Sequence, residues 1–158
     1  MMPHNIDPLL YELGRDAAFG LAMMAVVLSF NGVCFTRVLF MYRKMASWVS
    51  TSNTLGAIAL FVISVLMLAI VQLVAILIWG LTLYHQGLIP TRAMAILFSG
   101  SCYTTIGVFS DLLPAGWKSL ALFIAFSGLF SFAWATSIMM SMANAFTKAW
   151  DQSDSQKP

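Results

Sequence analysis

Charged side chains are scarce in this chain of 158 residues. Only 9% of the residues are Asp, Glu, Lys or Arg, whereas a soluble domain carries roughly 25%. With 60% hydrophobic residues and a mean hydropathy of +0.86, the chain has too few polar side chains to cover a surface in water. The composition predicts a one-domain integral membrane protein. The net charge of +2 is small and spread out, and it predicts no nucleic-acid partner.

The groups that most enzymes need are also missing. The two cysteines, Cys34 and Cys102, have no CxxC spacing, so we expect packing roles for them and neither a zinc site nor a disulfide. The sequence has no glycine-rich phosphate loop, no metal-ligand spacing, no paired carboxylates inside an apolar run and no ionisable residues placed for a proton relay. We therefore predict that the protein is not an enzyme and has no cofactor.

Three segments are long and apolar enough to cross a bilayer, which takes about 20 residues. They cover residues 17–36, 54–84 and 117–146, and they predict an all-α membrane protein with three transmembrane helices. The segment before them, 1–16, has no basic region typical of a signal peptide. It is either a short amphipathic helix on the membrane surface or a solvated leader. The last segment, 147–158, reads as a polar tail.

The connection between the second and third spans is unusual. Residues 91–103 have helical character and begin after Pro90, with Thr91 as a plausible cap. A helix of that length is about 20 Å long, too short to cross a membrane. Non-helical residues and the turn signal Pro114-Ala115-Gly116 follow it. A short apolar helix between two true spans predicts a re-entrant loop, with irregular backbone that is buried in protein or lines a watery cavity.

The distribution of lysine and arginine predicts the orientation. Three spans place five basic residues on one side of the membrane and three on the other, so the first side is expected to be cytoplasmic. We expect a multi-pass protein of the cell membrane with its N-terminus outside and its C-terminus in the cytoplasm. The five residues on the expected cytoplasmic side are Arg37, Arg43, Lys44, Lys148 and Lys157.

Three stretches carry a resemblance to a known family. They read "WGLTLYHQG", "AILFSGSCYTTIG" and "LLPAGWKSLALFIAFSGLFSFAWATS". Together they resemble the pore domain of the potassium-channel superfamily, in particular the small bacterial two-pore-domain-like ion channel proteins. The resemblance covers roughly residues 60–146. It implies a pore domain over 54–146 with an outer helix 54–84, a pore helix 91–103, a filter 104–111 and an inner helix 117–146; the first span is an additional helix.

A filter at this place is chemically reasonable. A dehydrated cation needs several oxygens at fixed distances, and stacked backbone carbonyls with a threonine hydroxyl supply them. Because one chain offers only one strand of carbonyls, we expect a homotetramer in the lipid bilayer. Potassium or sodium would then be the permeant ion. The resemblance assigns the ion filter to Thr104, Thr105, Ile106, Gly107 and Val108, supported from behind by Asp111.

The filter departs from the family pattern at its outer end. The family reads T-x-G-Y-G-D, whereas Val108 stands in place of the tyrosine and Phe109 in place of the second glycine if no gap is opened. If one residue is inserted instead, Asp111 keeps the place of the aspartate behind the filter. A side chain clashes with the backbone at positive φ, so Phe109 is a poor replacement for glycine. We therefore expect a cation channel with weak selectivity among monovalent cations. The alternative is a non-conducting interaction or assembly protein that keeps the pore fold with a decayed filter.

Three further residues inside the spans stand out. Gly128 lies within the third span and is either a hinge of the inner helix or a packing glycine. Asn31 and Gln72 are amides in apolar surroundings, which is costly unless they are hydrogen-bonded. For both amides we expect hydrogen bonds between helices in preference to a ligand-binding role.

Overall fold

The computed structural model describes residues 6–46, 54–107 and 112–154. These residues form four α-helices and one turn of 3₁₀-helix. The bounds are α1 Ile6–Ala46, α2 Thr54–His85, α3 Arg92–Tyr103, η1 Ala115–Trp117 and α4 Leu120–Asp154.

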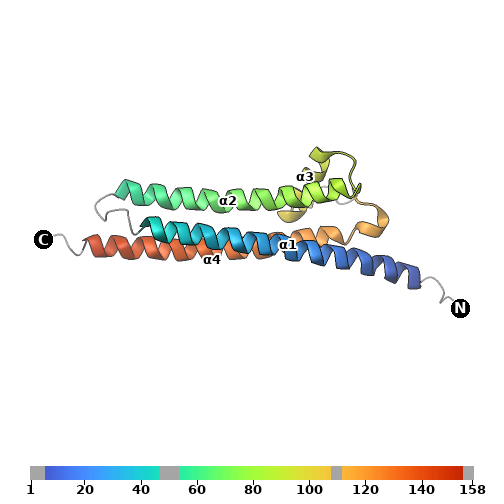
Figure 1. Cartoon of the computed structure of the whole chain (residues 1–158), viewed down its shortest axis with the longest axis horizontal. Helices are drawn as coiled ribbons and strands as arrows, with labels where there is room; N and C mark the ends of the chain where they lie inside the picture. The colour runs from blue at the N-terminus through green and yellow to red at the C-terminus, as the bar shows by residue number, and fades with distance from the viewer. Residues whose placement is uncertain (1–5, 47–53, 108–111, 155–158) are drawn as a thin grey trace.

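Three of the helices are long and lie side by side. α1 and α4 run in the same direction and α2 runs against them, as Figure 1 shows. The short helix α3 lies at the end of the bundle where α2 stops and α1 begins, and it contacts both α2 and α4. The chain ends at the opposite end of the bundle (Figure 1). The predicted all-α class with three long apolar helices is confirmed.

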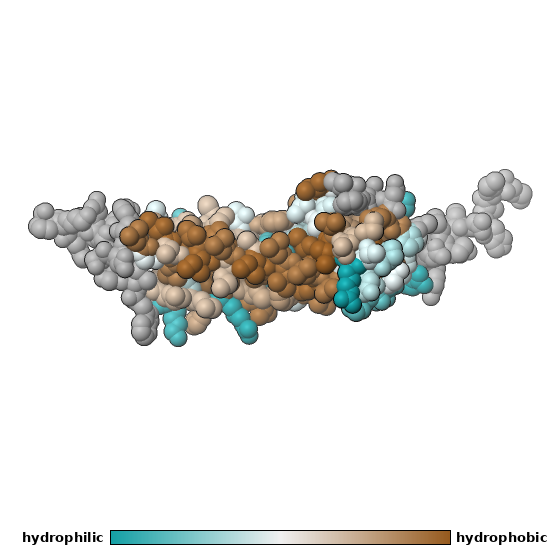
Figure 2. Space-filling view, turned by 90° about the horizontal axis from the view of Figure 1, so that it is seen from above, coloured by the Kyte–Doolittle hydropathy of each residue, from teal (hydrophilic) through white to brown (hydrophobic). Residues whose placement is uncertain are grey.

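The outer surface of the bundle is apolar. The three stretches suited to crossing a membrane are Gly14–Ala46, Leu55–His85 and Leu120–Thr147. Large hydrophobic side chains point outward all along them; Leu73 and Phe130, for example, are 60% and 59% exposed. On the face drawn in Figure 2, apolar residues fill the middle of the long axis. Because water would disfavour such a surface, the chain is a membrane protein.

Two of the helices are longer than the apolar pattern predicts. α1 begins at Ile6 and continues to Ala46, eleven residues before and ten residues after the predicted span 17–36. α4 continues to Asp154, into the segment predicted as a polar tail. Lysine and arginine are good helix formers, so charged residues end the apolar stretch without ending the helix.

The beginning of α1 packs against the turn before α4. Asp16 is 2% exposed, and Ser119 Oγ donates a hydrogen bond of 2.7 Å to its Oδ2 atom. The Arg15 guanidinium stacks over the Trp117 ring at 5.2 Å, and Phe19 meets the same ring edge-on. Asp16, predicted to belong to a surface segment, is therefore a buried link between α1 and the start of α4.

Glycines allow α3 to lie close to its two neighbours. A Cβ atom added at Gly80 of α2 would come within 2.8 Å of the Ile96 backbone. One added at Gly128 of α4 would overlap the carbonyl of Tyr103, at 2.0 Å from its oxygen. Gly128 therefore provides the space in which α3 ends, as a packing glycine does. α4 is continuous through this residue, and the hinge role stays a prediction.

We expect Gly128→Ala to lower the stability of the bundle by about 1–3 kcal/mol, the usual cost of overpacking. The reason is that the obstructing atoms belong to the backbone of Tyr103 and cannot turn aside. Gly14→Ala is the matched control, since Gly14 is also helical but has nothing within 4 Å. Thermal unfolding in detergent, followed by circular dichroism, measures both variants. Equal midpoints for the two would contradict the close approach at Gly128.

Candidate functional site

The short helix predicted over residues 91–103 is present as α3, Arg92–Tyr103, one residue shorter than expected. Thr91 stands at its N-cap in an extended conformation, φ −125° and ψ 141°, although its side chain makes no capping hydrogen bond. The helix is wedged between α2 and α4. Its C-terminal half is largely buried; the buried residues of α3 are Ala95, Phe98, Ser99, Ser101, Cys102 and Tyr103.

The end of α3 is closed by a Schellman motif. The N–H of Ile106 donates to Ser101 O at 2.8 Å, and the N–H of Thr105 donates to Cys102 O at 2.9 Å. Thr105 occupies the left-handed position of this motif, with φ 61°. That position normally belongs to glycine, and it is a strained conformation for a β-branched residue. Gly107, with φ 69°, is left-handed as well.

The same hydrogen bonds determine where the loop carbonyls point. Three successive N–H groups, those of Thr105, Ile106 and Gly107, donate back to carbonyls of α3 at 2.8–3.1 Å. In a trans peptide the C=O points opposite to the N–H of the next residue. The carbonyls of Thr104, Thr105 and Ile106 therefore point away from α3. Within the described ranges, the oxygens of Thr105 and Ile106 accept no hydrogen bond from a backbone N–H group.

The side chains of the loop are exposed in the single chain. Thr104 Oγ1 donates to Gly100 O at 2.7 Å, and Thr105 Oγ1 donates to Thr104 O at 2.7 Å. Both hydroxyl oxygens keep lone pairs that could accept a cation. Ile106 is 68% exposed, and a Cβ atom at Gly107 would have nothing within 4 Å.

The outer part of the predicted filter cannot be compared with the structure. Val108 and Asp111 lie outside the described residues, as does Phe109. Their roles in the filter and its support stay predictions from the sequence. The described part of the predicted filter is Thr104–Gly107, which forms one continuous exposed loop.

The loop begins at a buried polar cluster that joins all four helices. Tyr103 OH donates to Gln72 Oε1 of α2 at 2.6 Å. Asn31 Nδ2 of α1 donates to Tyr103 OH at 3.2 Å and to Ser131 Oγ of α4 at 2.6 Å. The prediction that Asn31 and Gln72 make hydrogen bonds between helices is confirmed. Sequence reasoning missed Tyr103, although a tyrosine directly before Thr-Thr-Ile-Gly was a usable signal.

The cluster lies deep in the bundle. Gln72 is 13 residues before the end of α2 at His85, which is about 20 Å at 1.5 Å per residue. Asn31 is likewise near the middle of the apolar stretch Gly14–Ala46. The hydrocarbon core of a bilayer is about 30 Å thick, so its midplane is about 15 Å from each edge. The loop after Tyr103 therefore starts near the middle of the apolar layer of the bundle.

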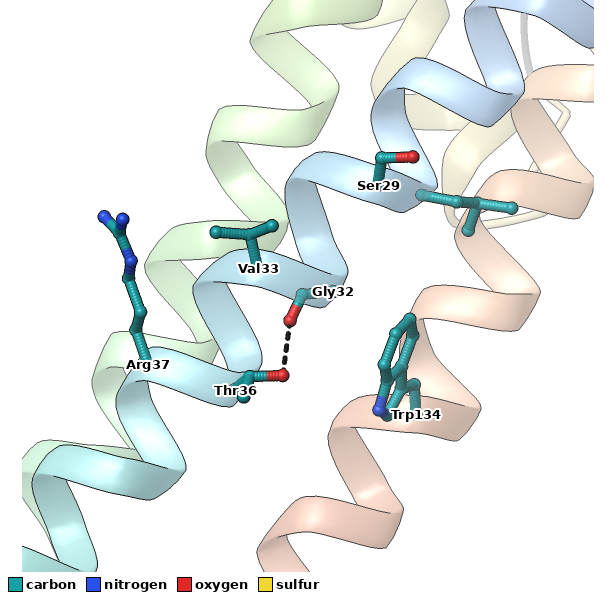
Figure 3. A pocket seen from close by; sticks show the side chains of 7 residues that line it. Ser29, Gly32, Val33, Thr36, Arg37 and Trp134 are labelled. Carbon is teal, nitrogen blue, oxygen red and sulfur yellow. Dashed lines mark hydrogen bonds between the residues drawn. The ribbon is translucent and has the colours of Figure 1, made fainter.

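A separate groove of about 740 Å³ lies between α1 and α4. Trp134 forms one wall and covers Gly32, while Arg37 projects on the far side of α1 (Figure 3). Thr36 Oγ1 donates to Gly32 O at 2.7 Å, so its hydroxyl is used within the helix. The groove does not include the loop after α3. Its lining residues are Leu28, Ser29, Gly32, Val33, Thr36, Arg37 and Trp134.

Metal-ligating side chains are not gathered in the described part of the chain. Residues 6–46, 54–107 and 112–154 contain no group of three His, Cys, Asp or Glu side chains that could hold a metal ion. Cys34 and Cys102 are both free thiols, partly buried and buried respectively.

No family model, curated protein or solved structure matches this chain.

We expect Thr105→Gly to raise the stability of the protein by about 1 kcal/mol, because glycine adopts φ 61° without strain. Thr104→Gly is the matched control one residue earlier. Thr104 has φ −87°, which suits any residue, and its hydroxyl bonds to Gly100 O, so this change should be destabilising. Thermal unfolding in detergent compares the two variants. If both lower the midpoint, the left-handed assignment of Thr105 is wrong.

Proposed function

We propose that the protein is a subunit of a cation channel, with an ion path lined by the loop after α3. The observation that carries this proposal is the row of outward carbonyls at Thr104, Thr105 and Ile106, beside two exposed threonine hydroxyls. Carbonyl oxygens of this kind replace the hydration shell of a monovalent cation. The C-terminal end of α3 adds the negative end of its helix dipole, which favours a cation at the same place.

The depth of the loop supports the same function. Irregular backbone within the hydrocarbon region is tolerated only where protein buries it or a watery cavity meets it. Thr104, Thr105 and Gly107 are nevertheless exposed in the single chain, although the loop begins near the middle of the apolar layer. Further copies of the chain arranged around a central, water-filled path would meet this requirement. In that arrangement α3 is a re-entrant pore helix.

A ring of four copies fits the need for several oxygens around one ion. One loop supplies oxygens from one side only, and closed rotational symmetry places identical loops around an axis. The third span then lies nearest the axis, as the resemblance to potassium-channel pore domains implies. α4 offers exposed apolar side chains for contacts between copies; those from its first half include Leu122, Phe126, Leu129, Phe130 and Phe132.

The proposed orientation has the N-terminus outside and the C-terminus in the cytoplasm of the cell. Arg37 and Arg43 lie in the part of α1 that leads to the end of the bundle opposite α3. The excess of lysine and arginine at that end supports a cytoplasmic location. The ion loop would then open toward the outside.

We propose weak selectivity among monovalent cations. The support comes from the sequence Val108-Phe109, where potassium-selective filters have tyrosine and glycine. Fewer well-formed sites discriminate less between potassium and sodium, because selectivity depends on the number and field of the oxygens. The competing function, an assembly protein with a decayed filter, predicts no ion flux at all.

The oligomeric state gives one test. We expect a mass of four chains in mild detergent, measured by native mass spectrometry or light scattering, because one loop cannot surround an ion. The monomer is 17.3 kDa, so a tetramer and a dimer are easily distinguished. Only monomers or dimers over a range of detergent concentrations would contradict the proposed ring.

Ion flux gives the decisive test. We expect purified protein in liposomes to conduct potassium and sodium at rates within about tenfold of each other. Gly107→Ala should reduce both fluxes by about tenfold or more, because alanine at φ 69° costs about 1–2 kcal/mol in each copy. No atom lies within 4 Å of the added methyl group, so the effect would come from the backbone alone.

Gly87→Ala is the matched control for this experiment. Gly87 also has a left-handed φ, 68°, and open space around it, but it lies in the turn after α2. It should therefore lose little flux. If the unmodified protein carries no cation, the non-conducting assembly function is favoured. If Gly107→Ala and Gly87→Ala conduct equally well, the loop is not the ion path.

A further inference from the structure

The role of α1 is the open question of this fold. The resemblance to channel pore domains begins after α1, so nothing in it explains why this helix is present. Yet α1 packs closely against α2 and α4, and it contributes Asn31 to the polar cluster beneath the loop. Asn31 is completely buried, with 0% of its surface exposed.

Asn31 acts on Tyr103, the last residue of α3. The Tyr103 ring is completely buried, and its hydroxyl is held between Asn31 Nδ2 at 3.2 Å and Gln72 Oε1 at 2.6 Å. At the other end of the residue, the Tyr103 carbonyl lies against Gly128. The residue is thus held at its side chain and at its backbone. Thr104, the first loop residue, follows directly.

The polar cluster restricts the position of α3 more than it adds to the stability of the bundle. Two of its buried atoms, Asn31 Oδ1 and Gln72 Nε2, have no hydrogen-bond partner among the described residues. An incompletely satisfied polar group in an apolar layer lowers stability relative to an apolar side chain of similar size. Directional hydrogen bonds, however, favour one rotation of the Tyr103 ring and one height of α3 between its neighbours.

We propose that Asn31 is a positioning residue: through the Tyr103 hydroxyl it sets the rotation and height of the end of α3, and so the direction of the carbonyls at Thr104, Thr105 and Ile106. α1 then holds the ion loop in position and is more than an additional helix in the membrane. Only the consequence of this positioning, a defined ion path, rests on the proposed function. The mechanical part, control of the loop by Asn31, can be measured without ion flux.

Hydrogen–deuterium exchange of the loop amides is the direct test. The N–H groups of Thr105, Ile106 and Gly107 are protected by their bonds to α3. We expect Asn31→Leu to speed exchange at these amides about five- to tenfold. The reason is that local opening of the loop then breaks one hydrogen bond fewer. Tyr103→Phe removes the same hydrogen bond and also the one to Gln72, so it should speed exchange at least as much. Because Tyr103→Phe already removes the hydrogen bond with Asn31, the double variant should add little further increase.

Ser64→Ala is the matched control. Ser64 is a buried polar residue of α2, but its hydroxyl donates only to Leu60 O within the same helix, at 2.8 Å. Its removal should leave exchange in the loop unchanged. If Asn31→Leu lowers the unfolding midpoint while loop exchange stays at the control value, Asn31 has only a structural role and the inference is wrong. Should Asn31→Leu fail to fold, the smaller change Asn31→Ala decides the question by the same criterion.

Flux measurements separate this inference from the proposed function. In a conducting protein, Asn31→Leu and Tyr103→Phe should change the ratio of potassium to sodium flux, whereas Ser64→Ala should not. Faster loop exchange in a protein that carries no ions would overturn the channel function and leave the positioning role in place. Flux with unchanged loop exchange and an unchanged ion ratio would overturn the positioning role alone.

Discussion

The hydrogen bonds of the Tyr103 hydroxyl are the interactions on which the rest of this structure depends. They join α3 to α1 and α2 inside the apolar bundle, and Asn31 extends the same cluster to Ser131 of α4. In lipid, a polar side chain must find its partners within the protein, and those of this cluster lie in neighbouring helices. The cluster therefore specifies how the helices are aligned along their length. Apolar packing alone would leave that alignment weakly determined, because lipid tails are as apolar as the side chains that they meet.

The close approach of α3 to its neighbours is the second requirement. Gly80 and Gly128 leave room for the backbone of α3 on two sides, at Ile96 and at Tyr103. Without that room, Tyr103 could not place its hydroxyl in the polar cluster while its carbonyl rests on α4. The small residues and the polar residues thus stabilise the same position of α3. In this position the end of α3 lies deep in the bundle, and the following loop is exposed with its carbonyls directed away from the helix.

Several predictions from the sequence agree with the structure because they depend on hydrophobicity and length. Apolar stretches near residues 17–36 and 54–84 marked helices, and the short segment 91–103 marked a helix that cannot span. The ends of α1 and α4 were misjudged because a charged residue ends an apolar stretch without breaking a helix. The left-handed φ of Gly107 suits a glycine, whereas that of Thr105 was not foreseen, since β-branched residues avoid it.

The sequence alone determined that this is a membrane protein of three long apolar helices, with a short helix and a polar loop between the last two. Composition and the length of the apolar stretches suffice for that, because a helix needs about 20 mostly apolar residues to cross the bilayer. Only the tertiary structure decided that Asn31, Gln72, Tyr103 and Ser131 meet, that Gly128 holds the end of α3, and that Asp16 is buried against Ser119. Such contacts join residues as many as 103 positions apart. They depend on helix rotation and height, which no local pattern of residues specifies.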